Sequence, residues 1–157
     1  LKKNLIKNNS KIINVASGAH WGVELDFNDL EMMKNYNGWI AYKKSKLCNI
    51  LFTKKLSQIL KKDKINVNCL HPGFVQTNFG SNNNCIINLG IKFAMKFAGI
   101  NINEGTETLL YLIKTQDKIT GEYFYKNKVT PSSNFSISKI NANKLWDKSL
   151  ELSAKYL

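Results

Sequence analysis

Apolar residues along this chain occur either in short continuous runs or in longer stretches with helical spacing. The segments 11–17 (KIINVAS) and 65–73 (INVNCLHPG) are short, β-branched runs that stop at Ser-Gly and Pro-Gly, which is typical of buried strands. Residues 40–60 lie between them and repeat apolar side chains at helical spacing. The pattern therefore predicts two buried strands joined by one long helix.

Weaker patterns predict the remaining elements. A third strand is expected over residues 121–128 (GEYFYKNK). Further helices are expected over residues 1–9, 30–34, 85–100, 104–114 and 141–157. Asn103 or a neighbouring residue is expected to cap the helix over 104–114. The expected inward face of the last helix consists of Leu145, Trp146, Leu150 and Leu152.

This order of elements favours an α/β fold with a parallel sheet, because neighbouring parallel strands need a helical crossover between them. Only three strands are expected, so the sheet would be thin. Its first strand is apolar and would leave an unpaired edge. We therefore expect either association with another chain, as a homo-oligomer or by pairing through that first strand, or a missing part of the sheet.

Composition limits the class of protein. The 157 residues fit one domain, and a hydrophobic fraction of 43% is enough for a core. The net charge is +12, but the lysines are spread along the chain, so no nucleic-acid partner is expected. The chain lacks both a long apolar run and a signal-peptide pattern, so we expect no membrane span and a cytoplasmic location. Three cysteines without CxxC spacing and two histidines without a ligand pattern indicate a reduced protein with no metal.

The segment 38–52 (GWIAYKKSKLCNILF) places a tyrosine and a lysine one helical turn apart, Tyr42 and Lys46. In open α/β sheets, ligands bind beyond the carboxyl ends of the strands, where Ser17 and the Pro72-Gly73 turn are expected. A phenol exchanges protons poorly near neutral pH until a nearby ammonium favours the phenolate. Ser17 could then hold a carbonyl or alkoxide oxygen while Tyr42 exchanges the proton. The alternatives are a chance surface pair on the helix and a serine that only caps the strand end.

The strand that ends in Ser17, the helix with Tyr42 and Lys46, and the strand that ends in Pro72-Gly73 follow one another in the chain. In that order they resemble the short-chain dehydrogenase/reductase family, and within it the retinol-dehydrogenase-like branch. The resemblance rests on KIINVASGAH, AYKKSKLCNILFTKKL, VNCLHPGFVQTNF, NEGTETLLYL, TGEYFYKNK and LWDKSLEL, and it covers essentially the whole chain. It implies a Rossmann-like doubly wound parallel sheet. It also implies hydride transfer between a nicotinamide cofactor and an alcohol or carbonyl.

The resemblance further implies roles for individual residues. Ser17, Tyr42 and Lys46 match the family's catalytic serine, its proton-transferring tyrosine, and the lysine that favours the tyrosinate and holds the nicotinamide ribose. The implied cofactor-binding set is Tyr42, Lys46, Pro72, Gly73, Phe74, Val75 and Thr77. The substrate pocket is expected to involve Gly18, His20, Tyr36 and Trp39, with His20 exposed or at the rim and not acting as a base.

Several of the family's motifs have no counterpart in this sequence. The glycine-rich phosphate turn, the ribose-selecting residue, the Asn-Asn-Ala-Gly segment and the catalytic asparagine all lie upstream of residues 11–17 in the family. Residues 1–157 are therefore expected to be the C-terminal portion of a single domain of this family, with its last three strands and their flanking helices. The expected cofactor is NADP or NAD, and the resemblance slightly favours NADP, which this branch uses more often. Aliphatic and Phe side chains in 86–100, where the family varies its substrate pocket, favour an apolar alcohol or carbonyl.

Two functions from different classes remain open at this point. One is an NAD(P)-dependent oxidoreductase with a Ser-Tyr-Lys site, of which these residues are a fragment expected to be inactive alone. The other is a non-catalytic remnant that acts as a basic protein-interaction module, for which the exposed first strand supplies the pairing edge.

Because the glycine-rich turn is missing from these 157 residues, the chain by itself should bind NAD(P) weakly or not at all. Isothermal titration calorimetry of the chain with NADPH and with NADH measures this. Binding at micromolar concentration would contradict the expectation.

Overall fold

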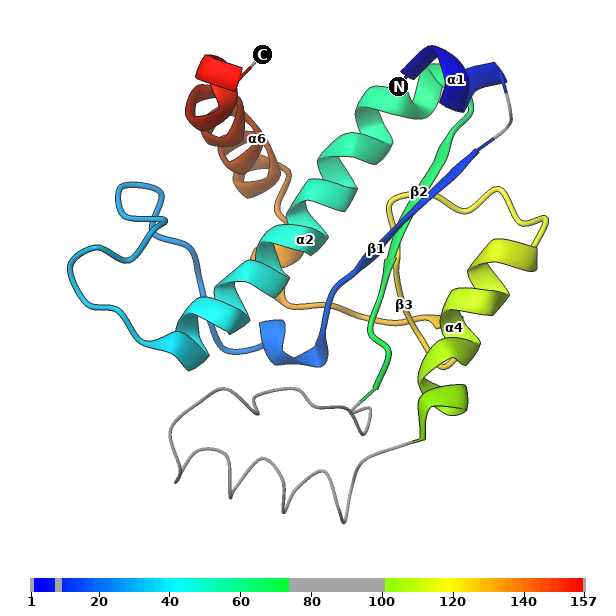
Figure 1. Cartoon of the computed structure of the whole chain (residues 1–157), viewed down its shortest axis with the longest axis horizontal. Coiled ribbons are helices and arrows are strands. Elements are labelled where there is room, and N and C mark those ends of the chain that lie inside the picture. The colour runs from blue at the N-terminus through cyan, green and yellow to red at the C-terminus, as the bar shows by residue number, and fades with distance from the viewer. Residues whose placement is uncertain (1, 8–9, 74–100, 157) are drawn as a thin grey trace.

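The computed structural model describes residues 2–7, 10–73 and 101–156 (Figure 1). In chain order the elements are α1 (Lys2–Lys7), β1 (Lys11–Val15), η1 (Gly18–His20), α2 (Gly38–Leu60), η2 (Lys61–Asp63), β2 (Asn66–Leu70), α4 (Ile102–Lys114), β3 (Tyr123–Tyr125), β4 (Lys128–Val129), α5 (Asn134–Ile137), α6 (Lys139–Ser153) and η3 (Ala154–Tyr156), where η denotes a 3₁₀ turn. The helix predicted over residues 85–100 lies outside the described residues.

The strands form one sheet in the order β1-β2-β3-β4. Strand β1 pairs in parallel with β2, from Lys11 opposite Asn66 to Val15 opposite Leu70, and β2 pairs in parallel with β3. Helix α2 is the crossover between β1 and β2. The predicted α/β fold with a mostly parallel sheet is confirmed.

Helices cover both faces of the sheet. Successive side chains of a strand point to opposite faces, and β2 shows this at its end. Cys69 packs in one cluster with Ile50 of α2, whereas Leu70 packs in another with Leu112 of α4 and Phe124 of β3. Figure 1 accordingly shows α2 and α6 on one side of the strands and α4 on the other. Coverage of both faces explains why four of the five residues of β2 are buried.

Helix α2 combines a polar start with an apolar inner face. It begins after Asn37, whose side-chain oxygen accepts the Ile40 N–H at 3.0 Å. Leu47, Ile50 and Leu51 are fully buried at helical spacing, and the two leucines also pack against α6. The long helix predicted over 40–60 is confirmed.

The third predicted strand, over residues 121–128, is instead a hairpin. Phe124 pairs with Val129 and Tyr125 with Lys128, so β3 and β4 run antiparallel. The two residues between them, Lys126 and Asn127, have φ values of 48° and 63°. Two consecutive positive φ angles are what the commonest two-residue hairpin turn requires, and Asn tolerates them well. The sheet therefore has four strands in the described part of the chain, and not the three that were expected.

The short helix predicted over residues 30–34 is wrong. Met32 has a φ of 55°, which a right-handed helix does not allow. The Asp29 carboxylate accepts the backbone N–H groups of Met33 at 2.8 Å and Lys34 at 3.3 Å. This side chain therefore occupies backbone donors that a helix would otherwise use.

The cap of α4 also differs from the expectation. Asn101, and not Asn103, supplies the capping oxygen, which accepts the Glu104 N–H at 2.9 Å. The helix consequently begins two residues earlier than the apolar pattern indicated, at Ile102.

The predicted inward face of α6 is correct only in part. Leu145 is buried, and Trp146 stacks on Phe52 of α2 with ring centroids 5.7 Å apart. Leu150 and Leu152 are each 47% exposed, because the buried residues of this helix fall in its first half. No sequence pattern predicted α5.

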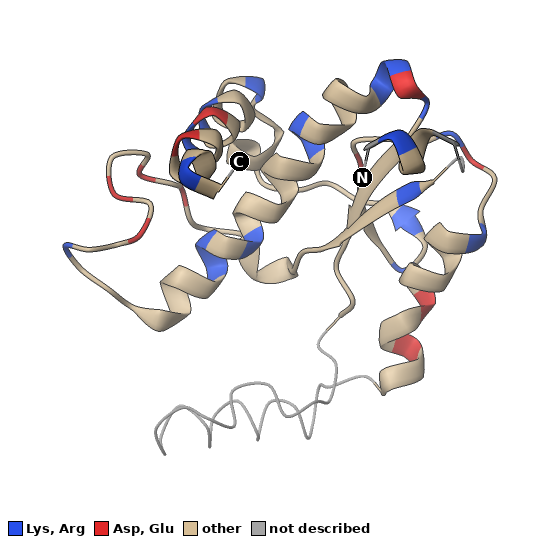
Figure 2. Cartoon of the chain, turned by 45° about the horizontal axis from the view of Figure 1, so that its top comes forward, with Lys and Arg blue, Asp and Glu red and all other residues tan. Residues whose placement is uncertain are grey.

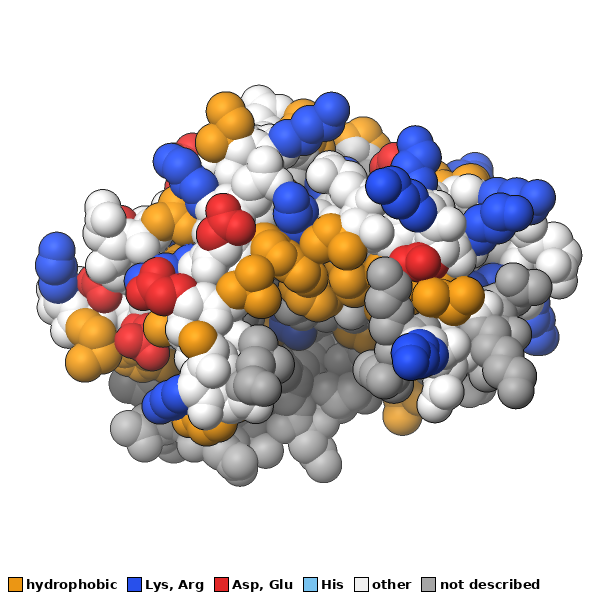
Figure 3. Space-filling model, turned by 90° about the horizontal axis from the view of Figure 1, so that it is seen from above, with side chains coloured by type: hydrophobic (Ala, Val, Ile, Leu, Met, Phe, Trp, Pro, Cys, Tyr) orange, Lys and Arg blue, Asp and Glu red, His pale blue; other side chains and the backbone are white. Residues whose placement is uncertain are grey.

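The first strand leaves an open edge. Within the described residues, β1 has β2 on one side and no strand on the other, as expected. Val15 at the end of β1 is 47% exposed. Figure 3 shows apolar side chains gathered into a patch on the face seen from above.

Charges are distributed over several elements. Lysines lie on most of the helices in the view of Figure 2, whereas the carboxylates lie mainly in the loop after η1, on α4 and on α6. In the part of the chain that the structure describes, no helix is both long enough and apolar enough to span a membrane.

Gly121 is a position where a side chain should be costly. Its φ is +82°, and a Cβ there would lie 2.7 Å from Ser57 Oγ on α2. We expect Gly121→Ala to lower the free energy of unfolding by about 2–3 kcal/mol, since backbone strain and overpacking add. Gly22→Ala is the matched control: φ is +70°, but the nearest atom is Lys43 Nζ at 3.8 Å, so about 1 kcal/mol is expected. Urea unfolding measures both, and equal losses would contradict the packing contribution.

Candidate active site

The carboxyl ends of β1 and β2 meet at one edge of the sheet. The Ala16 N–H donates to the Leu70 carbonyl at 2.8 Å, which extends the ladder by one bond beyond the strands. Ser17 lies two residues beyond the end of β1, and the residues His71 to Gly73 follow β2. This is the edge at which open α/β sheets bind their ligands.

Ser17 is held in an extended conformation, with φ −161° and ψ 153°. Its hydroxyl oxygen accepts the Ala19 N–H at 3.1 Å and so caps η1. Capping and a role in the site are compatible, because the bond uses a lone pair of the oxygen. The hydroxyl hydrogen therefore stays available to donate to a ligand oxygen.

Tyr42 and Lys46 lie on the first turns of α2, which packs against η1 beside Ser17. The Lys46 ammonium nitrogen is 5.6 Å from the centroid of the Tyr42 ring, so the positive charge lies over the phenol. Trp39 stacks on the other side of the same pair, with its ring centroid 5.6 Å from that of Tyr42. The spacing that predicted a common helix face is thus realised as a direct contact.

His20 is completely buried, with 0% of its surface exposed, so its predicted place at the pocket rim is wrong. Its Nδ1 lies 2.7 Å from the Ser17 carbonyl oxygen, and its Nε2 accepts the Ser133 N–H at 3.2 Å. Burial lowers the pKa of His20, and the hydrogen bond to Ser17 opposes the shift. The histidine is therefore an internal polar connection, and no local pattern predicted its partner 113 residues away.

His71 follows β2 directly and contacts the neighbouring segments. Its ring stacks on Tyr125 with centroids 4.8 Å apart, and its Nδ1 accepts the Gly73 N–H at 3.3 Å. Its Nε2 lies 3.0 Å from the position that a Cβ on Gly18 would occupy. The ring thus supports the turn after β2. It also leaves little space for a side chain at Gly18, which the sequence analysis assigned to the substrate pocket. Burial, and then the neighbouring His20, lower the pKa of His71.

The other predicted site residues fall into two groups. Tyr36 and Trp39 are 74% and 54% exposed around the start of α2, so they are on the surface near the tyrosine and lysine. The predicted cofactor residues Phe74, Val75 and Thr77 lie outside the described residues.

A hollow of about 460 Å³ borders Pro72 on the side of α4. Its lining comes from Pro72, from the first two turns of α4 and from the β3–β4 turn, and it includes Glu104, Glu107 and Lys126. These walls combine charged side chains with the apolar surfaces of Pro72 and Tyr125. The predicted apolar wall over 86–100 lies outside the described residues.

Asn49 is a site residue that the sequence analysis missed. Its Nδ2 donates to the Val15 carbonyl at 3.0 Å and so fastens α2 to the end of β1. Asn49 follows Tyr42 by seven residues, two helical turns, and therefore shares its face of α2. A sequence signal for it existed, because Asn49 is a polar residue on a helix face that is expected to contact the sheet.

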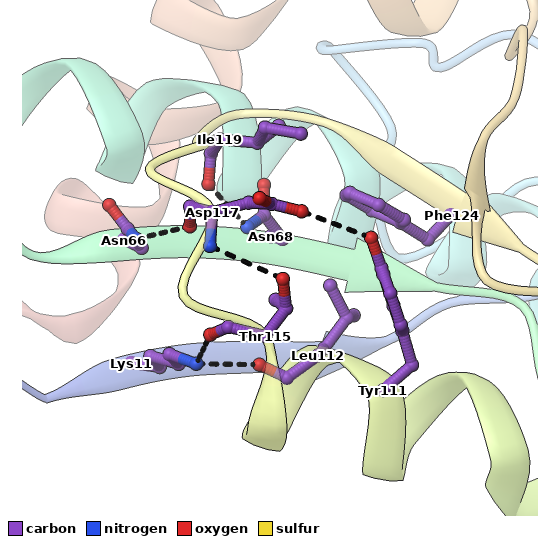
Figure 4. A pocket seen from close by; sticks show the side chains of 9 residues that line it. All are labelled: Lys11, Asn66, Asn68, Tyr111, Leu112, Thr115, Asp117, Ile119 and Phe124. Atoms are coloured by element: carbon purple, nitrogen blue, oxygen red, sulfur yellow. Dashed lines mark hydrogen bonds between the residues drawn. The ribbon is translucent and has the colours of Figure 1, made fainter.

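A second polar cluster lies at the opposite, amino end of the sheet (Figure 4). The Lys11 ammonium donates to the carbonyl oxygens of Leu112 at 3.0 Å and Ile113 at 2.8 Å, and also to that of Thr115. These are the last carbonyls of α4, which a cation stabilises. Because the lysine is saturated by protein carbonyls, we assign this cluster to structure and not to ligand binding.

Thiol and metal chemistry find no support in the described residues. Burial raises the pKa of Cys48 to about 11 and that of Cys69 to about 12, so both thiols stay protonated. Residues 2–7, 10–73 and 101–156 contain no group of three or more His, Cys, Asp or Glu side chains that could hold a metal ion.

Fold and site together define a class, the open parallel α/β proteins whose ligands bind beyond the carboxyl ends of neighbouring strands. The family model for short chain dehydrogenases matches residues 3–85, more than half of the chain. The chain belongs to the short-chain dehydrogenase family, as its motifs predicted.

Similar curated proteins include the Short-chain dehydrogenase TIC 32 A, chloroplastic, of Brassica napus, which is 35% identical over 153 residues. Retinol dehydrogenase 14 and Retinol dehydrogenase 13 of Mus musculus are 34% and 33% identical over 146 and 150 residues. In the same order, the alignments cover 90%, 88% and 91% of this chain and 46%, 42% and 45% of those proteins. The chain thus spans less than half the length of these relatives.

A solved structure agrees on the fold. The crystal structure of an uncharacterised protein from Mycobacterium Paratuberculosis matches with a TM-score of 0.68 and 23% identity. The match covers 92% of this chain and 50% of that one. It confirms the predicted partial Rossmann-like sheet.

Acid should destabilise the protein through its buried histidines. The pKa of His20 is lowered in the folded state, so below its ordinary value of 6.5 the unfolded chain binds more protons. We expect stability to be retained above pH 6.5 and to fall below it, by at most about 1.4 kcal/mol per pH unit for each excluded proton. Urea unfolding between pH 5 and 8 measures the slope. The slope should shrink in His20→Asn, and an unchanged slope would contradict the assignment.

Proposed function

We propose that this chain carries the proton-transfer half of an NAD(P)-dependent oxidoreductase that interconverts an alcohol and a carbonyl. The observation that supports this most directly is the contact between Lys46 and the Tyr42 ring on a helix that packs beside the turn of Ser17. Membership of the short-chain dehydrogenase family gives the reaction class.

The donor groups at this edge suit part of a nicotinamide cofactor. The Lys46 ammonium is the group expected to hold the nicotinamide ribose, and the turn at Pro72 and Gly73, which follows β2 at the same edge of the sheet, is expected to border the nicotinamide ring. When bound, the cofactor supplies or accepts the hydride. NADP and NAD are both consistent with these residues.

In the direction of reduction, Tyr42 gives its phenolic proton to the substrate oxygen as the carbonyl carbon receives the hydride, which yields the alcohol. Ser17 donates a hydrogen bond to the same oxygen and so stabilises its developing negative charge. The Lys46 ammonium, which lies over the ring, stabilises the phenolate that remains until a proton from solvent restores it. Oxidation runs through the same steps in reverse.

The substrate we propose is an apolar alcohol or carbonyl. Two observations favour it: the aliphatic and Phe residues in the sequence 86–100, and the names of two relatives, which are retinol dehydrogenases. A small-molecule substrate of this kind requires no nucleic-acid partner.

A second candidate is a non-catalytic, basic interaction module. The open edge of β1 in the described residues favours it, because unpaired strand edges recruit further strands. Its distinguishing property is the absence of turnover in every form of the protein.

Tyr42→Phe tests the proposal. In a form of the enzyme that also contains the phosphate-binding turn, the variant should lose turnover by about 10³-fold, because the proton donor is removed, while cofactor affinity changes little. Tyr156→Phe is the matched control: its tyrosine is 78% exposed in η3 and has no proposed role in the site, so the variant should keep full activity. Cofactor oxidation at 340 nm and cofactor titration provide the two measurements. Full activity of Tyr42→Phe would contradict the mechanism, and no turnover by the unaltered enzyme on any carbonyl or alcohol would favour the interaction module.

A further inference from the structure

We propose that His20 is a positioning residue of the active site, which fixes the peptide group of Ser17 by fastening it to the segment after β4. This inference rests on the proposed function of Ser17. It adds a residue that neither touches the reacting atoms nor exchanges their proton.

The hydrogen bonds of His20 determine which nitrogen carries the proton. A backbone N–H can only donate, so the Ser133 N–H at 3.2 Å requires an unprotonated Nε2. The neutral ring must then carry its hydrogen on Nδ1, from which it donates to the Ser17 carbonyl at 2.7 Å. Each ring nitrogen therefore has one partner of the right kind, and a second proton would place two N–H groups against each other.

Ser17 is held from two sides by the turn that follows it. Its carbonyl accepts both the His20 ring N–H at 2.7 Å and the His20 backbone N–H at 3.3 Å. Its hydroxyl oxygen accepts the Ala19 N–H at 3.1 Å. Because the peptide plane and the side chain are both restrained, the direction of the remaining hydroxyl hydrogen is restricted to the open side of the site.

The imidazole itself is held in place by its neighbours. Tyr123 meets it edge-on with ring centroids 5.2 Å apart, and Trp21 lies against it at 5.3 Å. The ring is fully buried. Rotation about its side-chain bonds would break these contacts and both hydrogen bonds. The position of Ser133 therefore determines, through the ring, the position of the Ser17 peptide group.

The anchor comes from a distant part of the sequence. Ser133 directly precedes α5 and belongs to the segment that, after β4, runs back across the molecule to α2 and α6 (Figure 1). Its own backbone is fixed, since its carbonyl accepts the N–H groups of Ser136 at 2.9 Å and Ile137 at 3.3 Å. The C-terminal segment thus supports the site without supplying a reacting group.

Two amide variants separate the two bonds of the ring. In His20→Asn, the side-chain amide can reach the place of Nδ1 and donate to Ser17, but the bond to Ser133 is lost. In His20→Gln, the amide oxygen can reach the place of Nε2 and accept from Ser133, but the bond to Ser17 is lost. Both variants lose the contacts of the ring with Trp21 and Tyr123, so the midpoint temperature of thermal unfolding should fall in both.

In the form of the enzyme that turns over, His20→Gln should lower kcat at least about tenfold, whereas His20→Asn should keep kcat within about threefold. The KM for substrate and the affinity for cofactor should change little in either variant, because neither is proposed to contact His20. Losses of kcat that are equal in the two variants, or that follow their losses of thermal stability, would overturn the positioning role.

NMR of the 157-residue chain provides a readout that does not depend on activity. With ¹⁵N-labelled histidine, Nδ1 of His20 should appear protonated and Nε2 unprotonated at pH 7.5. The ¹³C shift of the Ser17 carbonyl should change in His20→Gln and stay close to that of the unaltered chain in His20→Asn. A proton on Nε2, or a Ser17 carbonyl shift indifferent to both variants, would overturn the inference. If these signals appear as expected while Tyr42→Phe is fully active, the proposed function fails but the hold of His20 on Ser17 stands.

Discussion

The parallel pairing of β1 with β2 is the constraint from which the site follows. Two parallel strands point the same way, so their carboxyl ends share one edge, and the chain must return through α2 to begin the second strand. That return places the first turns of α2 at the same edge. Ser17, the pair of Tyr42 and Lys46, and the turn at His71 to Gly73 converge from three separate segments for this reason.

Helix α2 serves the core and the site with different faces of one element. Its buried leucines and Ile50 hold the sheet and α6, while Asn49 ties its polar side to the Val15 carbonyl. The apolar contacts supply most of the stability, since burial of each such side chain is worth about 1.5–3 kcal/mol. A second polar bond joins the same two elements, because the Asn14 side chain of β1 donates to the Thr53 hydroxyl of α2 at 2.8 Å. These two bonds add less energy, but they help to fix the rotation of the helix and with it the direction of its tyrosine.

The regular part of this architecture could be predicted from sequence because strands and helices produce local periodic patterns of apolar residues. The buried strands and the long helix follow from spacings of two and of three to four residues, and the Tyr-Lys pair follows from a single turn. The hairpin at Lys126 and Asn127 was missed because two positive φ angles turn an apparently continuous strand back on itself. The region 30–34 was misassigned because the Asp29 side chain competes for backbone donors. His20 was misplaced because its environment is set by Ser133, a residue with no local relation to it.

Several lysines illustrate how composition can mislead. Lys11 closes the end of α4, Lys54 donates to the Gly121 carbonyl at 3.2 Å, and Lys55 donates to Asn143 at 2.7 Å. These cations hold segments of the fold together across long stretches of sequence. Part of the net charge of +12 therefore comes from lysines that form hydrogen bonds within the fold, and only the rest is free to attract binding partners.

The bond between His20 and Ser133 also orders events during synthesis. The two residues are 113 positions apart, so at about 5–20 residues per second the ribosome takes roughly 6–23 s to deliver the second after the first. Throughout that interval Nε2 of His20 has no Ser133 N–H to accept, so the imidazole that bonds Ser17 is not yet anchored. On the nascent chain, strands β1 and β2 and the helix between them can already be assembled while the site is still unfinished.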